Sequence, residues 1–263
     1  MKLIKILILI IVFILILYGG LQIGNKLYNK YNIRNNTINV TIPEGYTYEK
    51  VGQTLEKSGL VSQKDFMNQV ENWTDNNYWF LKGLPNDKHK LDGFLYPATY
   101  SFLKDTPSKT IINKMLRTFE INMETNKNYI TKTKLNVRDI MVIASLIEKE
   151  AGKDIDRSKI SSVIYNRLNI NMPLQIDATI LYVIGNKAKL YNKDLAVKSP
   201  YNTYLNKGLP PSPICNPGTK SINAALHPAK TDYIYYVLNS ETNEHVFSKT
   251  YVEHNKNVAK YIK

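Results

Sequence analysis

The distribution of apolar residues divides the chain into one continuous apolar segment and a long region of alternating and periodic patterns. Ile6 to Gly24 is almost unbroken apolar sequence. At 1.5 Å per residue, its roughly 19 residues match the hydrocarbon thickness of a bilayer. No small-x-small cleavage site follows, so the pattern predicts an uncleaved membrane anchor rather than a signal peptide. We assign residues 1–24 to a cytoplasmic tip and transmembrane anchor and expect the remainder to be exported.

The region after the anchor predicts a small unit of one strand and two helices. Alternating apolar and polar residues indicate a half-buried strand, and apolar spacing with capping residues indicates helices. The elements are a polar stalk over residues 25–37, a strand Ile38–Pro43, a helix Tyr48–Ser58 ended by Gly59, and a helix from Ser62 as N-cap to Val70. We assign residues 38–75 to this membrane-proximal β-α-α module.

The remaining residues, 76–263, predict a larger domain of mixed helices and short strands. Helices are expected at Lys109–Asn126, Val137–Ala151, Asp156–Asn169, Ala178–Ile184 and Ser221–Leu226, strands at Tyr233–Leu238 and His245–Ser248, and a last helix from Tyr251. Helices that do not alternate regularly with strands favour an α+β fold over a doubly wound sheet. No glycine-rich nucleotide-binding motif occurs.

The composition shows a positive net charge and excludes an internal disulfide, because the chain has one cysteine. The 263 residues carry a formal net charge of +13, so an anionic partner has to be considered, with a uniform compositional bias as the alternative interpretation. The basic residues are spread along the chain without an Arg-rich run, which argues against a nucleic-acid partner. The single cysteine, Cys215, is predicted to be a packing residue. The four histidines are scattered, so we expect neither a metal nor another cofactor.

Two glutamates near the end of one predicted helix are the first candidates for chemistry. In the segment Ile140–Gly152 the apolar residues share one helical face, and Glu148 and Glu150 flank it while Lys149 points away. Partial burial at such a boundary raises a carboxyl pKa and keeps a proton available. Periodicity does not choose between the two glutamates, and solvated surface residues are the alternative interpretation.

Two later segments, Tyr165–Tyr182 and Ser199–Gly218, carry polar side chains among apolar ones. The candidate binding residues are Asn166, Gln175 and Asp177 in the first segment and Tyr201, Asn202 and Thr203 in the second. Carboxamide side chains are suited to sugar hydroxyls and N-acetyl groups. The structural alternative is that Asp177 caps the following helix and Asn166 fixes a loop.

The order and spacing of five segments resemble the endolytic murein transglycosylase (YceG-like) family. These segments are LDGFLYPATY, ASLIEKEAG, VIYNRL with PLQIDATILY, SPYNTY with GLPPSPICNPG, and VEHNK. The resemblance implies that Glu148 is catalytic, with Glu150 as the second choice, and that residues 38–75 are a LysM-like wall-binding module. The chain departs from the expected pattern at Asp92, where Glu is expected, and at Ala98, where Asp is expected.

The resemblance implies a bacterial inner-membrane enzyme that cuts peptidoglycan glycan strands without water. Glu148 would protonate the MurNAc–GlcNAc glycosidic oxygen and then accept the proton of the muramic C6 hydroxyl, leaving a 1,6-anhydro end. We expect it to act beside cell-wall synthases and to end nascent strands. Two alternatives stay open. A muramidase would use a second carboxylate such as Asp177, and an inactive scaffold would only bind the wall.

Overall fold

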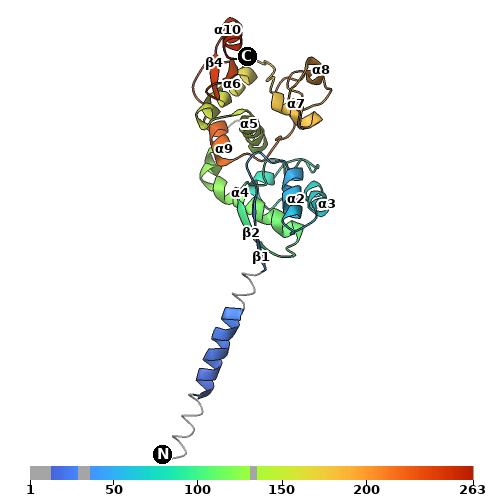
Figure 1. Ribbon diagram of the computed structural model, residues 1–263, viewed down its shortest axis with the longest axis vertical. Helices are drawn as coiled ribbons and strands as arrows, with labels where there is room; N and C mark the ends of the chain where they lie inside the picture. The colour runs from blue at the N-terminus through green and yellow to red at the C-terminus, as the bar shows by residue number, and fades with distance from the viewer. Residues whose placement is uncertain (1–12, 29–35, 131–134, 263) are drawn as a thin grey trace, which may run out of the picture.

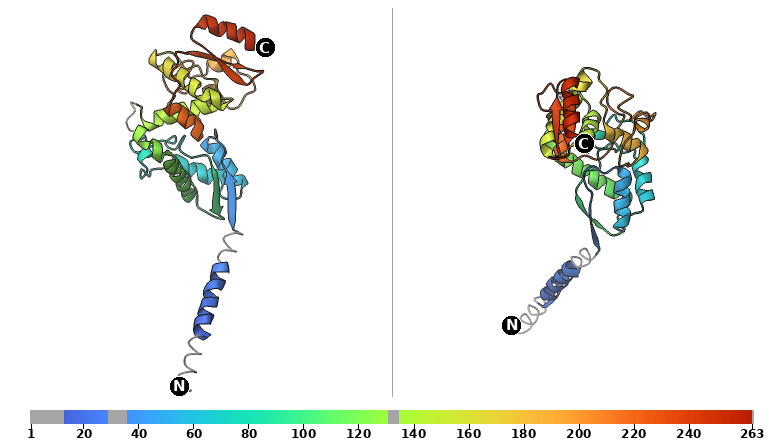
Figure 2. Two further views of the ribbon diagram at one scale, coloured as in Figure 1. Left: turned by 90° about the vertical axis from the view of Figure 1, so that its left-hand side faces the viewer. Right: turned by 45° about the horizontal axis from the view of Figure 1, so that its top comes forward.

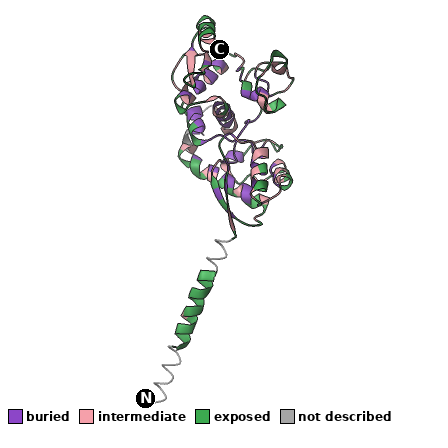
Figure 3. Ribbon diagram, viewed as in Figure 1, coloured by how far each residue is buried: buried purple, intermediate pink, exposed green. Residues whose placement is uncertain are grey.

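The structure is a computed structural model that describes residues 13–28, 36–130 and 135–262, and it confirms the predicted mixture of helices and strands (Figure 1). Residues 13–28 are helical, and their apolar side chains are exposed (Figure 3). Within the described ranges, no helix has both the length and the apolar content needed to cross a membrane. The predicted anchor Ile6–Gly24 lies partly in residues 1–12, outside the described ranges.

The N-terminal sheet joins two segments that are far apart in sequence. Strand β1 (Thr37–Thr41) pairs antiparallel with β2 (Thr99–Leu103), with Thr37 opposite Leu103. We did not predict β2, although its residues alternate between exposed and buried. The sheet therefore combines a strand of the predicted 38–75 module with a strand from beyond its expected end.

Helices α2 (Tyr48–Lys57) and α3 (Gln63–Glu71) pack against each other, as the β-α-α pattern predicts. The predicted N-cap is confirmed, because the Ser62 hydroxyl accepts a hydrogen bond from the Asp65 N–H at 3.1 Å. Gly59 has φ +74° where α2 has ended, a backbone conformation that favours glycine. Local sequence signals are thus sufficient to define both helices.

Helix α5 (Val137–Glu150) lies near the centre of the folded region (Figure 1). It packs chiefly against α9 (Thr219–Leu226) and also against α6 (Arg157–Asn169) and α7 (Asp177–Ile184). All residues of α5 from Ile140 to Ile147 are buried. This apolar environment fixes the helix and so fixes the glutamates at its end.

The other elements surround this centre. Helix α4 (Ser108–Ile130) is longer at both ends than the predicted Lys109–Asn126 helix. Strands β3 (Tyr235–Asn239) and β4 (Glu244–Ser248) form a second antiparallel sheet, covered by α10 (Tyr251–Tyr261). The two sheets lie at opposite ends of the folded region (Figures 1 and 2). The short elements are α8 (Asn192–Leu195), η1 (Trp79–Leu81) and η2 (Asp154–Asp156).

Candidate active site

The end of α5 carries its two glutamates in the predicted orientation. Glu148 and Glu150 are half-buried, whereas Lys149 between them is exposed. The helix positions them because its N-terminus is capped by Asn136, whose side chain accepts the Asp139 N–H at 2.9 Å, and because its apolar face is buried. The prediction that both carboxylates lie at the boundary of the core is confirmed.

Glu148 reaches the N-terminus of α9. Its Oε2 atom accepts hydrogen bonds from the Ser221 hydroxyl at 2.7 Å and from the Gly218 N–H at 3.1 Å. Arg157 at the start of α6 lies 3.5 Å from the same oxygen and also donates to Ser221. A helix N-terminus and a guanidinium both stabilise a carboxylate. The site therefore supports Glu148 after it has released a proton.

A third carboxylate, Glu44, lies beside Glu148, and sequence reasoning missed it. A β-carbon on Gly218 would fall 2.0 Å from the Glu44 carboxyl carbon, so the carboxylate occupies the space that this glycine leaves open. Since Gly218 also donates its N–H to Glu148, the two carboxylates are at most about 8 Å apart. No local pattern could reveal this pair, because 104 residues separate Gly45 from Lys149, which meet beside it.

The charge of Glu148 affects the ionisation of Glu44. The Glu44 residue is exposed overall, but its carboxyl group lies against Gly218. This partial burial, followed by repulsion from Glu148, raises the pKa of Glu44. Arg157 and Lys220 act in the opposite direction. The Glu148 carboxylate thus disfavours a second negative charge on Glu44.

Glu150 lies in a separate environment. It accepts a hydrogen bond from the Tyr236 hydroxyl at 3.0 Å, and burial raises the pKa of Glu150 to about 7. A cavity of about 350 Å³ is lined by Glu150 together with Gln175 and Asp177. Three of the predicted site residues are thus brought together here, on the side of α5 that faces β3.

Asp177 does not cap its helix, so this predicted role is wrong. Helix α7 begins at Asp177 itself, and the N-cap position is Ile176 without a side-chain hydrogen bond. The Asp177 carboxylate instead accepts a hydrogen bond from the Tyr204 hydroxyl at 2.5 Å. Its negative charge acts on Glu150, whose pKa it helps to raise. The carboxylate that lies beside Glu148 is Glu44.

The other four predicted binding residues make hydrogen bonds within the protein. The Asn166 amide donates to the carbonyls of Thr231 and Tyr233, at 2.8 and 2.9 Å, and so fixes the loop before β3. The Asn202 amide is fully buried and donates to the carbonyls of Leu195 and Val197. Both carboxamides thus have structural partners in this conformation.

Thr203 and Tyr201 connect neighbouring loops. The Thr203 hydroxyl accepts the Ile176 N–H at 2.9 Å, and this bond positions the start of α7. The Tyr201 hydroxyl lies 2.5 Å from that of Ser212, while its ring lines a large pocket. Their predicted substrate contacts stay predictions, and Tyr201 is the one of the two that faces this pocket.

The large pocket has a volume of about 800 Å³ and lies beside Glu148. Its lining includes Gly45 and Lys149, and a β-carbon on Gly45 would be 3.7 Å from the Glu148 Cγ atom. A volume of this order holds a sizeable ligand. Its wall is also formed by residues of α2 and α7, so it lies between segments that are far apart in sequence.

The buried cysteine has a packing role, as predicted. Cys215 is 2% exposed and carries a free thiol. Burial raises the pKa of this thiol, which keeps it protonated and poorly nucleophilic. It therefore belongs to the framework beneath the site.

The family model that matches this chain is the YceG-like family, and the match extends over residues 20–260. The chain belongs to this family. A relative from Bacillus subtilis (strain 168), an endolytic murein transglycosylase, is 45% identical over 234 residues that cover 85% of this chain and 65% of the relative. One from Streptococcus pneumoniae (serotype 2, strain D39 / NCTC 7466), with the same name, is 33% identical over 245 residues, 85% of this chain and 44% of the relative.

A solved member of this YceG-like group supports the fold. The crystal structure of a yceG-like protein from Listeria monocytogenes matches with a TM-score of 0.74 and 38% identity, and it covers 84% of this chain and 76% of that chain. The chain spans 65% and 44% of the two curated relatives' lengths, less than two thirds of each. The match to the YceG-like family over residues 20–260 confirms the resemblance seen in the five segments.

Proposed function

We propose that this chain is a membrane-anchored lytic transglycosylase that cleaves the MurNAc–GlcNAc bond inside peptidoglycan glycan strands and leaves 1,6-anhydro-MurNAc ends. The observation that carries the proposal is the position of Glu148. Its carboxylate is held by Ser221 and Gly218. Its neighbours Gly45 and Lys149 line a pocket of about 800 Å³ between residues of α2, α5 and α7. The names of the two curated relatives support the same reaction.

The mechanism uses Glu148 first as an acid and then as a base. Protonated Glu148 gives its proton to the glycosidic oxygen as the bond from this oxygen to the anomeric carbon of MurNAc breaks. The muramic C6 oxygen then bonds to that carbon and loses its proton to the Glu148 carboxylate. The proton released in the second step replaces the one given in the first, so no water is consumed.

The surrounding groups fit the step in which Glu148 becomes a carboxylate. Ser221, the Gly218 N–H and Arg157 stabilise the carboxylate that forms on proton transfer. Repulsion from Glu148 raises the pKa of Glu44, so a second negative charge beside that carboxylate is disfavoured. The same contacts therefore hold Glu148 in place and support it after it has given up its proton.

The decisive experiment compares Glu148→Gln with Glu150→Gln in the full chain on polymeric glycan, with products identified by mass spectrometry. We expect wild-type protein to give anhydro-ended fragments and Glu148→Gln to lose about 10²–10⁴-fold in rate. Glu150→Gln should stay within about tenfold of wild type, since this residue would not touch the scissile bond. The reverse order would transfer the catalytic role to Glu150.

A muramidase is the second candidate, and Glu44 is the observation that favours it. A separation of at most about 8 Å is compatible with the roughly 5–10 Å between the two carboxyl groups of such glycosidases. Hydrolysis would give reducing-end MurNAc instead of the anhydro sugar, so the same mass spectra separate the two reactions. Glycan binding without cleavage would instead indicate an inactive wall-binding scaffold.

The location, the wall-binding module and the partners complete the proposal. Phe13, Ile14 and Leu15 are each more than half exposed on the 13–28 helix, as expected for side chains that face lipid. We assign residues 38–75 a LysM-like role and place the chain in the inner membrane beside cell-wall synthases, where it would end nascent strands. Recovery of the protein in the soluble fraction, or unchanged glycan length in cells lacking it, would contradict this assignment.

A further inference from the structure

The large pocket beside Glu148 has a strongly cationic lining. Lys50 comes from α2, Lys88 and His89 from the loop before β2, and Lys149 from α5. Among the described residues that line this pocket, Glu49 on α2 is the one acidic side chain. Cations from three separate parts of the fold thus converge on one cavity, which is unlike a charge run along a single exposed face.

His89 is held in place at the edge of this pocket. Its Nδ1 atom lies 2.8 Å from the Asp92 Oδ2 atom, which also accepts the Ser212 hydroxyl at 3.0 Å. The bond to Asp92 raises the pKa of His89. The bond to Asp92 therefore orients the imidazole at the pocket edge and favours its protonated form.

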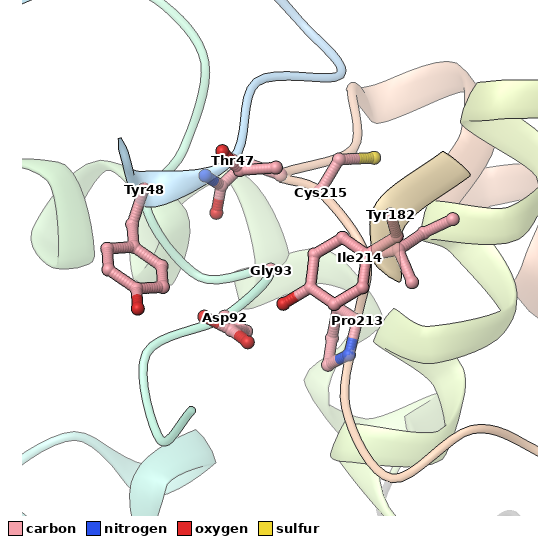
Figure 4. Close-up of a pocket in the computed structure, with 9 residues that line it drawn as sticks. Thr47, Tyr48, Asp92, Gly93, Tyr182, Pro213, Ile214 and Cys215 are labelled. Atoms are coloured by element: carbon pink, nitrogen blue, oxygen red, sulfur yellow. The ribbon is translucent and has the colours of Figure 1, made fainter. Parts of the chain in front are cut away.

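Asp92 itself lies beneath the pocket. It is 6% exposed, and its Oδ1 atom is buried without a hydrogen-bond partner. This residue lines a cavity of about 10 Å³ that shares Thr47, Tyr48 and Tyr182 with the large pocket. In Figure 4 the Tyr182 hydroxyl points towards Asp92. The carboxylate thus supports the pocket wall from below and is shielded from solvent.

Aromatic rings complete the wall. Tyr182 and Tyr201 both line the pocket, and their ring centroids are 4.8 Å apart. Tyr48 lines it from α2. A surface of aromatic rings and spaced cations suits a ligand with carboxylates on a partly apolar backbone, because rings contact the backbone while ammonium groups pair with the carboxylates.

We propose that this pocket binds the carboxylate-bearing peptide stem of the glycan strand, so that the enzyme selects strands that still carry their stems. The inference rests on the proposed function, since the stem is attached to the sugar next to the bond that Glu148 would cleave. Lys149 and Gly45 line the pocket, and Gly45 also lies against the Glu148 side chain. The glycan would therefore lie at Glu148 with its stem directed into the pocket.

The test measures kcat/KM of the full chain on glycan strands with intact stems and on strands whose stems have been removed by an amidase. The variant is Lys50→Gln with Lys88→Gln, and the matched control is Lys57→Gln with Lys64→Gln, two exposed lysines of the same helix pair outside the pocket. Wild type and control should prefer intact strands by about tenfold, and the pocket variant by less than about twofold. Equal rates for wild type on both strands, or an unchanged preference in the pocket variant, would overturn the proposal.

A binding measurement tests the pocket independently of whether the protein cleaves glycan. Fluorescence anisotropy with a labelled stem peptide should show Kd weakened about tenfold or more by the pocket variant and unchanged in the control, whether or not the glycan is cleaved. If poly(glycerol phosphate) binds through these lysines and the peptide does not, the pocket serves a phosphate polymer and the proposal is wrong. If Glu148→Gln cleaves normally while peptide binding follows the lysines, only the proposed catalytic role fails.

Discussion

Glu44 and Glu148 meet at Gly218. Glu148 accepts the N–H of this glycine at 3.1 Å, and the Glu44 carboxylate fills the space of its absent β-carbon. The turn that precedes α2 thereby contributes a charge to the end of α5. This contact makes the N-terminal module part of the candidate site and motivates the first two predictions.

Replacing Glu148 by Gln should lower the pKa of Glu44. Removing the Glu148 charge removes its repulsion of Glu44, while Arg157 and Lys220, which lower this pKa, remain. We therefore expect the Glu44 carboxyl to release its proton at lower pH in the variant, as measured by carbon-13 NMR of the side-chain carboxyl. Glu56→Gln, on α2, serves as control. A Glu44 titration that does not move would exclude coupling between the two carboxylates.

Gly218→Ala should alter activity more than stability. The backbone at Gly218 has φ −80°, which alanine adopts without strain. The added methyl group would displace the Glu44 carboxylate, which is the end of a flexible side chain. We expect a loss of stability below about 1 kcal/mol, together with a change in kcat/KM on polymeric glycan, since the Glu44 carboxylate moves away from Glu148. Urea denaturation and a rate measurement report the two effects, and a large loss of stability would show that Glu44 cannot move.

Glu150→Gln should stabilise the protein at pH 8 and have little effect at pH 5. With a pKa of about 7 in the folded state against an ordinary 4.5, the native protein holds a proton that the unfolded chain has released. Stability therefore falls as pH rises from about 4.5 to 7, by up to about 3 kcal/mol. Gln stays neutral and still accepts from Tyr236. Denaturation at both pH values tests this, with exposed Glu124→Gln as control, and equal effects at both pH values would contradict it.

Gly93→Ala should destabilise the fold by more than about 2 kcal/mol. Gly93 has φ +82°, and a β-carbon there would lie 2.8 Å from the Pro213 Cγ atom and 3.4 Å from the Met141 Cβ atom. Gly59→Ala is the matched control, because Gly59 has φ +74° with nothing within 4 Å, so it reports the backbone cost alone, about 1 kcal/mol. Equal losses in urea denaturation would show that the contact with Pro213 is not limiting.

The sequence alone determined the helices and the placement of their side chains. Ser62 and Gly59 set the ends of neighbouring helices, and the apolar face of α5 placed Glu148 and Glu150 at its edges, because capping and periodicity act within a few residues. The five segments that resemble the family were sufficient to identify it, and the match over residues 20–260 confirms this identification.

Only the tertiary structure decided which groups share a site. It paired Thr37 with Leu103, brought Glu44 to Glu148, and placed Asp177 beside Glu150. These contacts join segments tens to more than a hundred residues apart. Strand pairing and loop packing at such separations depend on the whole core, so no local pattern of residues specifies them.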